Sequence, residues 1–136
     1  MAPRQPNREI QERVTLTYDH AQLTGDLTVK LYDVPSGRQL KVERVRYINP
    51  TGLAEDASNY FAISVKNGST VVAGPLSTDS AGAGTNSIAA DTFTAITVAT
   101  DGSEVLDAGD VLSVLFDETG TATLPAGRVV IDALLV

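Results

Sequence analysis

His20 is the only histidine of the chain, so any chemistry that needs an imidazole has to use it. Asp19 precedes it directly, but a hydrolase also needs a nucleophile placed against such a base. The chain has no cysteine, which removes thiol nucleophiles and thiolate metal sites. The histidine-rich metal site of small β-barrel enzymes cannot be built from one histidine. We therefore expect no enzyme, no catalytic residue, no metal and no cofactor.

Four carboxylates lie within ten residues, and oxygen ligands of this kind are what calcium requires. They are Asp101, Glu104, Asp107 and Asp110. Their spacing differs from that of an EF-hand loop, and Asp and Gly are also the usual residues of tight turns. The sequence favours ordinary turns and leaves calcium open.

A sugar-binding site would need exposed aromatic rings, above all tryptophan. The chain has no tryptophan, four tyrosines and three phenylalanines. Tyr18, Tyr47 and Phe93 fall on positions predicted to face the core, and Phe116 lies in an apolar run. Glycan binding therefore remains the second choice.

The net charge of −7 is unevenly distributed along the chain. Residues 1–46 contain eight basic and six acidic residues, whereas residues 47–136 contain two basic and eleven acidic residues. Nucleic-acid binders normally present a basic surface, so we expect no nucleic-acid partner.

The elements that must position these residues are strands, because apolar residues recur with a period of two. The phase of this alternation changes between Val42 and Val45, which predicts a β-bulge or a bend onto a second sheet. Asn67-Gly68 between two apolar runs predicts a tight hairpin. A single helical turn is expected over Thr51–Ser58. The predicted strands cover residues 14–18, 27–31, 38–49, 60–65, 70–72, 91–100, 111–116 and 128–136.

These runs predict an all-β chain, a two-layer antiparallel β-sandwich that is jelly-roll-like, with about eight strands and an extended N-terminal arm. An immunoglobulin-like topology is the alternative. Residues 1–8 form the arm, because Pro3 and Pro6 interrupt strand pairing, and residues 9–136 form one sandwich domain. The arm lacks the apolar stretch of a secretory signal, and no run is long enough to span a membrane, so we expect a soluble chain that is not exported.

Three segments of the C-terminal half resemble tailed-bacteriophage capsid decoration proteins, also called cement proteins. They are Asn67-Gly-Ser-Thr-Val-Val72, Val105-Leu-Asp-Ala-Gly-Asp-Val-Leu-Ser-Val-Leu-Phe116 and Ala126-Gly-Arg-Val-Val-Ile-Asp132. The resemblance covers roughly residues 40–136. It implies a non-enzymatic structural protein that binds the outer surface of an icosahedral phage capsid and cements neighbouring major capsid subunits.

The partners implied are the major capsid protein and other copies of this chain, as a homo-oligomer, with a dimer preferred to a trimer and no membrane involved. The expected location is the capsid exterior of the virion, after synthesis in the host cytoplasm. From the residues we expect the protein interface to use Arg4, Arg8, Lys41, Arg44 and Arg46. The alternative is a receptor- or glycan-binding module of a viral fibre or tail.

Overall fold

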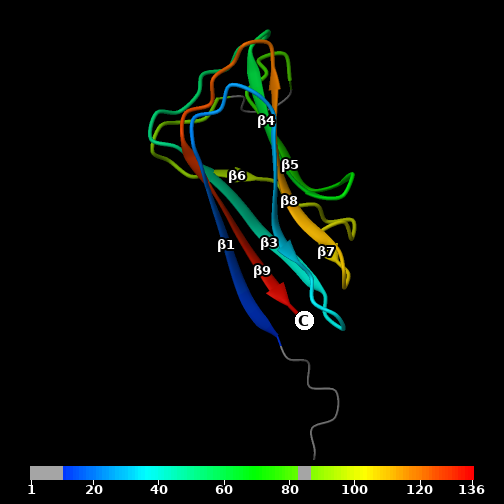
Figure 1. The fold of residues 1–136 in the computed structure, drawn as a ribbon. Helices are drawn as coiled ribbons and strands as arrows, with labels where there is room; N and C mark the ends of the chain where they lie inside the picture. The colour runs from blue at the N-terminus through cyan, green and yellow to red at the C-terminus, as the bar shows by residue number, and fades with distance from the viewer. Residues whose placement is uncertain (1–10, 83–86) are drawn as a thin grey trace, which may run out of the picture.

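The computed structural model describes residues 11–82 and 87–136, which form nine strands and no helix (Figure 1). The strands are β1 (Glu12–His20), β2 (Leu27–Asp33), β3 (Leu40–Ile48), β4 (Tyr60–Asn67), β5 (Thr70–Ser77), β6 (Thr94–Ile96), β7 (Val105–Leu106), β8 (Val111–Thr119) and β9 (Gly127–Leu135). The predicted all-β class is therefore confirmed. The strand that the sequence analysis missed is the two-residue β7.

Two antiparallel sheets make up the sandwich. One has the order β1-β9-β3-β6, with β7 also paired to β3, and the other has the order β2-β8-β4-β5. Four of the pairs are nested in the sequence: β4 with β5, β3 with β6, β2 with β8 and β1 with β9. Such nesting is what results when a long hairpin is rolled up across two sheets. The chain is a jelly roll, and the immunoglobulin-like alternative is wrong.

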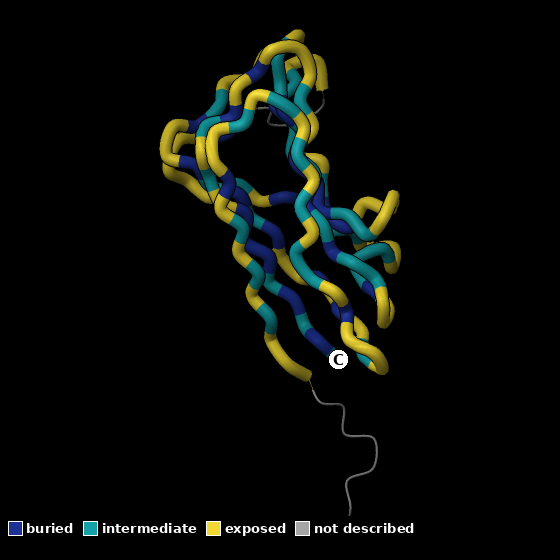
Figure 2. The backbone as a smooth tube through the Cα atoms, in the orientation of Figure 1, coloured by how far each residue is buried: buried dark blue, intermediate teal, exposed yellow. Residues whose placement is uncertain are grey.

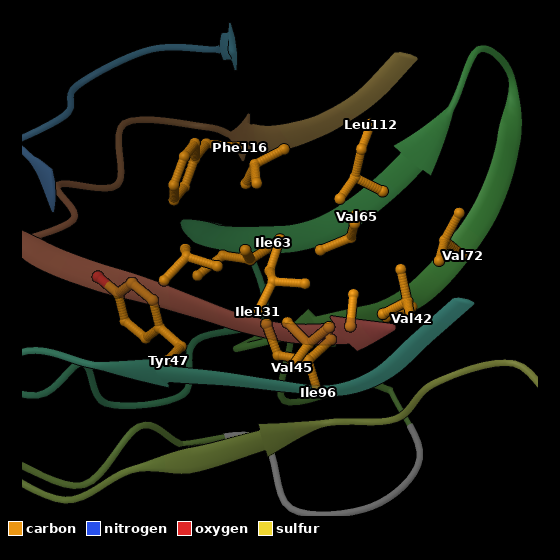
Figure 3. Close-up of a cluster of buried hydrophobic side chains, with 14 of the residues drawn as sticks. Val42, Val45, Tyr47, Ile63, Val65, Val72, Ile96, Leu112, Phe116 and Ile131 are labelled. Carbon is orange, nitrogen blue, oxygen red and sulfur yellow. The ribbon is translucent and has the colours of Figure 1, made fainter. Parts of the chain in front are cut away.

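The core lies between the sheets because each strand turns alternate residues inward. From β3, Val42, Val45 and Tyr47 meet Ile63 and Val65 of β4 across the interior (Figure 3). The burial pattern follows the strands in Figure 2, where dark-blue positions concentrate on the central ones. β8 lies between β2 and β4, and β9 lies between β1 and β3, which fits their largely apolar composition.

The predicted change of phase in β3 is a bulge. The pairing of β3 with β9 shifts between Val42 and Arg44, so Val42 and Val45 both face the core although their parities differ. The predicted hairpin at Asn67 is also confirmed, since Asn67 pairs with Thr70 and Gly68 has a φ of 60°.

The helical turn expected over Thr51–Ser58 is wrong. Leu53 exchanges two backbone hydrogen bonds with Ile88, of 2.9 and 2.8 Å, so its backbone groups bond to a distant segment rather than within a helical turn. Gly52 has a φ of 78°, which no right-handed helix accommodates. The side-chain amide oxygen of Asn49 accepts the N–H groups of Thr51 and Gly52 and holds this bend.

The strand expected over residues 91–100 is shorter than predicted. Only Thr94–Ile96 pairs with β3, and two residues later Val98 of the same segment pairs with Ala73 of β5, in the other sheet. The segment therefore passes from one sheet to the other and cannot form one long strand. Phe93 was expected in the core, but it is 45% exposed. The extended arm predicted for residues 1–8 lies outside the described residues.

Candidate interaction surface

The outward side of three adjacent strands forms a face rich in charged residues, here called the outer β1–β9–β3 face. β9 contributes its middle column, and β1 and β3 contribute a column on each side. The strand register decides which side chains are neighbours across the three strands. Near one end, Asp19 of β1 lies beside Arg128 of β9, and next along the strands Thr17 and Arg46 lie on either side of Val130. Further along, Thr15 and Arg44 lie on either side of Asp132, and Arg13 and Lys41 on either side of Leu134. Glu43 of the bulge completes the face.

Basic residues are concentrated on this face. The chain has ten Lys and Arg residues, and Arg4 and Arg8 precede the described part. Of the other eight, the outer β1–β9–β3 face carries five: Arg13, Lys41, Arg44, Arg46 and Arg128. Three acidic residues, Asp19, Glu43 and Asp132, lie among them, so this face is net positive on a chain that is strongly acidic overall.

Lys41, Arg44 and Arg46 of the predicted interface thus lie together on β3. Before the bulge, Lys41 alternates with the buried Leu40 and Val42. After the bulge, Arg44 and Arg46 alternate with the buried Val45 and Tyr47, so all three basic side chains point away from the core. Lys41 and Arg44 are exposed, and Lys41 borders a shallow hollow of about 350 Å³ beside the bulge, with Glu43 and Glu104 in its lining. Arg4 and Arg8 lie outside the described residues.

Arg46 differs from its neighbours because its side chain is only 24% exposed. Its guanidinium lies 4.7 Å from the ring centroid of Phe93 and 3.5 Å from the carboxylate of Asp132. A cation held over an aromatic face in this way is stabilised by the ring's quadrupole. The guanidinium thus lies over one face of the partly exposed Phe93 ring.

A bidentate pair fixes the end of the face. Arg128 donates to both carboxylate oxygens of Asp19, at 2.5 and 3.1 Å, across the β1–β9 ladder. These hydrogen bonds lower the pKa of Asp19 and raise the pKa of Arg128. Arg13, at the other end of β1, is 3.9 Å from Glu43, and its side chain is 84% exposed. Arg13 is therefore held loosely and is free to contact a partner.

His20 has a structural position. It is 4% exposed, and its Nδ1 lies 2.7 Å from the carbonyl oxygen of Ala21, so Nδ1 carries the proton and donates. Nε2 then accepts from the Tyr47 hydroxyl at 2.7 Å. Asn49 in turn donates to that hydroxyl at 3.3 Å. This chain of hydrogen bonds, here called the His20 relay, joins β1 to β3 and to the bend after it.

Burial determines the protonation states in the His20 relay. Desolvation lowers the pKa of His20, outweighing the hydrogen bond to Ala21 and the charge of Asp19. Burial also raises the pKa of Tyr47 to about 12. Both groups are neutral near neutral pH, and each is occupied by a hydrogen-bond partner inside the sandwich.

Three of the four clustered carboxylates accept backbone N–H groups within turns, and the fourth, Asp107, accepts from the side chain of Gln39 at 2.7 Å. Asp101 accepts the N–H of Ser103, and Glu104 accepts the N–H of Gly102. Asp110 accepts the N–H of Asp107, closing the tight entry into β8. No group of three or more metal-ligating side chains with the spacing of a cation site occurs within residues 11–82 and 87–136. The turn interpretation agrees with this geometry.

Sequence reasoning missed Arg13, Arg128 and Asp132 as members of the face. Their parity was visible, because each alternates with core residues of its strand. Their proximity to Arg44 was not visible, since it depends on β9 lying between β1 and β3.

No helix able to cross a membrane is found in the part of the chain that the structure describes. No family model matches the sequence, and no significant match was found among curated proteins or solved structures. The fold and the outer β1–β9–β3 face therefore carry the functional argument.

Proposed function

We propose that this chain is a non-enzymatic structural protein that binds the outer surface of an icosahedral phage capsid and cements neighbouring major capsid subunits. The observation that carries the proposal is the outer β1–β9–β3 face, where five basic residues gather on a chain of net charge −7. A sheet face that carries the exposed Lys41 and Arg44 fits a broad protein surface better than it fits a small molecule, which is usually bound in an enclosed pocket.

Charge gives this face a partner preference. Its net positive charge would steer the chain toward an acidic patch of the shell, while the acidic remainder of the molecule would be repelled from that patch. Arg4 and Arg8 precede β1 in the sequence and are two further basic residues near this end of the chain. Each contact can be weak, because an oligomer that holds several subunits gains effective concentration after its first contact.

Charge reversal on the two sheets provides a matched test. The double variant K41E/R44E removes the exposed cations of β3, and K30E/K66E makes the same change in net charge on the outer side of the β2-β8-β4-β5 sheet. Empty shells assembled from the major capsid protein of the same genome are mixed with each variant and sedimented. We expect K41E/R44E to lose binding by about tenfold or more, with K30E/K66E close to the unmodified chain.

Equal losses in the two variants would mean that net charge, rather than this face, governs attachment. No co-sedimentation of the unmodified chain would overturn the proposal. Deleting residues 1–8 should also weaken attachment while leaving the β-rich circular dichroism spectrum unchanged, and unchanged attachment would remove the N-terminal segment from the interface.

A further inference from the structure

The free edge of β1 differs from the other sheet edges. A sheet edge presents unpaired backbone N–H and C=O groups, and natural proteins normally block pairing there with bulges, prolines or very short strands. The β2 edge has a register shift between Lys30 and Tyr32. The β5 edge contains Pro75 and two register shifts against β4. At the last edge, β6 and β7 have only three and two residues.

β1 has none of these devices, and its charged residues, which also discourage pairing when unmatched, lie only at its two ends. Its nine residues contain no proline and pair with β9 without any shift from Glu12 to His20. Within the described residues, β9 is the only strand that pairs with β1, which leaves its other edge open at the side of the sandwich (Figure 1).

The side chains beside this edge are incompletely covered. Val14, Leu16 and Tyr18 face the core, yet they are only half-buried, whereas Ile131 and Ala133 on neighbouring β9 are buried. Figure 2 shows the same alternation of half-buried and exposed positions along β1. The inward residues of β2, the edge strand of the opposite sheet, are half-buried as well. The sandwich is thus open along the side formed by β1 and β2.

The β1 sequence, Glu-Arg-Val-Thr-Leu-Thr-Tyr-Asp-His, is chemically complementary to itself when read in the antiparallel direction. Pairing centred on Leu16 places Leu16 against Leu16 of a second copy and Thr15 against Thr17 of that copy. It also places Arg13 opposite Asp19 of the second copy, and the two-fold symmetry creates this ion pair twice. Opposite charges and Thr–Thr contacts at directly facing positions stabilise antiparallel pairs.

Other registers lose this match. The core-facing residues of both copies must lie on one side of the joined sheet, so even-numbered positions must face even-numbered positions. Moving the centre to Thr15 places Arg13 opposite Thr17, and moving it to Thr17 places Asp19 opposite Thr15. Only the register centred on Leu16 pairs all nine residues and places Arg13 of each copy opposite Asp19 of the other.

From the open edge, the half-buried residues beside it and the self-complementary charges, we infer that two copies of this chain associate through antiparallel pairing of their β1 strands. The two outer β1–β9–β3 faces then lie side by side and point in the same direction, because the two-fold axis is perpendicular to the joined sheet. Asp19 accepts from Arg128 and, with its remaining lone pairs, from Arg13 of the second copy. This dimer supplies the oligomer of the proposed function, but it forms without any shell.

Cysteine cross-linking tests the register directly, because the chain has no cysteine of its own. Leu16 lies on the two-fold axis, where facing Cα atoms of an antiparallel pair are about 4.5–5.5 Å apart, within the span of a disulfide. The matched control is T17C, since the two copies of Thr17 would be separated by about 8 Å. Under mild oxidation we expect L16C to form a covalent dimer and T17C to remain mostly monomeric on a non-reducing gel.

Charge reversal tests the same interface in a variant that leaves the core untouched. R13E replaces two ion pairs of the dimer by two repulsive pairs and should raise the dimer dissociation constant by about tenfold or more in sedimentation velocity. K30E, with the same change in charge on an exposed site of β2, is the control and should behave as the unmodified chain.

A monomeric mass for the unmodified chain at high micromolar concentration, without shells, would overturn the inference. Cross-linking of T17C in place of L16C would overturn the register. Because these measurements contain no capsid, a dimer that fails to bind shells would refute the proposed function alone, and a shell-binding monomer would refute the dimer alone.

Discussion

Lowering the pH from about 7.5 to about 5.5 should destabilise this protein through His20. The folded chain holds the neutral imidazole, because Nδ1 donates to the Ala21 carbonyl and Nε2 accepts from the Tyr47 hydroxyl. A second proton on Nε2 would replace this acceptor by a donor in a buried site. Desolvation accordingly lowers the pKa of His20 below 6.5 in the folded state.

The sign follows from proton linkage. Between the two pKa values the unfolded chain binds more protons than the folded chain, so acid favours unfolding. The stability that neutral His20 contributes is fully present above its pKa in the unfolded chain, about 6.5, and is lost as the pH falls toward its lower pKa in the folded chain. A single group contributes at most about 1.4 kcal/mol per pH unit, so the loss at about pH 5.5 is at most about 1.4 kcal/mol.

Urea unfolding followed by tyrosine fluorescence at several pH values measures this loss. The control is H20Q, which cannot titrate but keeps a polar side chain of similar reach. We expect the unmodified chain to lose stability between about pH 7.5 and 5.5 and H20Q to lose less over the same range. If the free energy of unfolding depends on pH equally in the two proteins, or if the unmodified chain gains stability on acidification, His20 is not the group responsible.

Three further substitutions test the packing around the core by the same urea assay. Y47F leaves two buried hydrogen-bond partners unpaired and should cost about 2–4 kcal/mol, whereas a loss well below this range would mean that the His20 relay adds little. G127A should cost about 1–3 kcal/mol, because a Cβ there would meet the Tyr47 hydroxyl oxygen at 2.5 Å and the Ile48 carbonyl oxygen at 2.7 Å. G25A is its control, because a Cβ at Gly25 would lie 3.8 Å from the nearest atom, and equal costs for the two variants would contradict crowding at Gly127. L112A removes a fully buried side chain and should cost about 2–5 kcal/mol, so a near-neutral result would contradict its core position.

The sequence predicted the sandwich well, because a period of two reports which side of a strand is covered. Val42 and Val45 even located the bulge of β3 from their change of phase. The prediction failed where distant segments decide the local structure. Thr51–Ser58 turns to pair with Ile88, and residues 91–100 cross between the sheets, so neither follows its local pattern.

The same distinction applies to the candidate surface. The outward parity of Arg44 and Arg46 was visible in the sequence, since Val45 and Tyr47 alternate with them. The contacts of Arg46 with Asp132 and Phe93 required the strand order, as did the hydrogen bond between His20 and Tyr47, which are 27 residues apart. Parity shows which way a side chain points, whereas topology decides what it meets.

A cryo-electron microscopy reconstruction of empty shells saturated with the chain would test the central claim most directly. We expect density on the outside of the shell, spanning neighbouring major capsid subunits, with Lys41 and Arg44 of the outer β1–β9–β3 face turned toward them. Shells without added density, or density in which the β2-β8-β4-β5 sheet faces the shell, would contradict it.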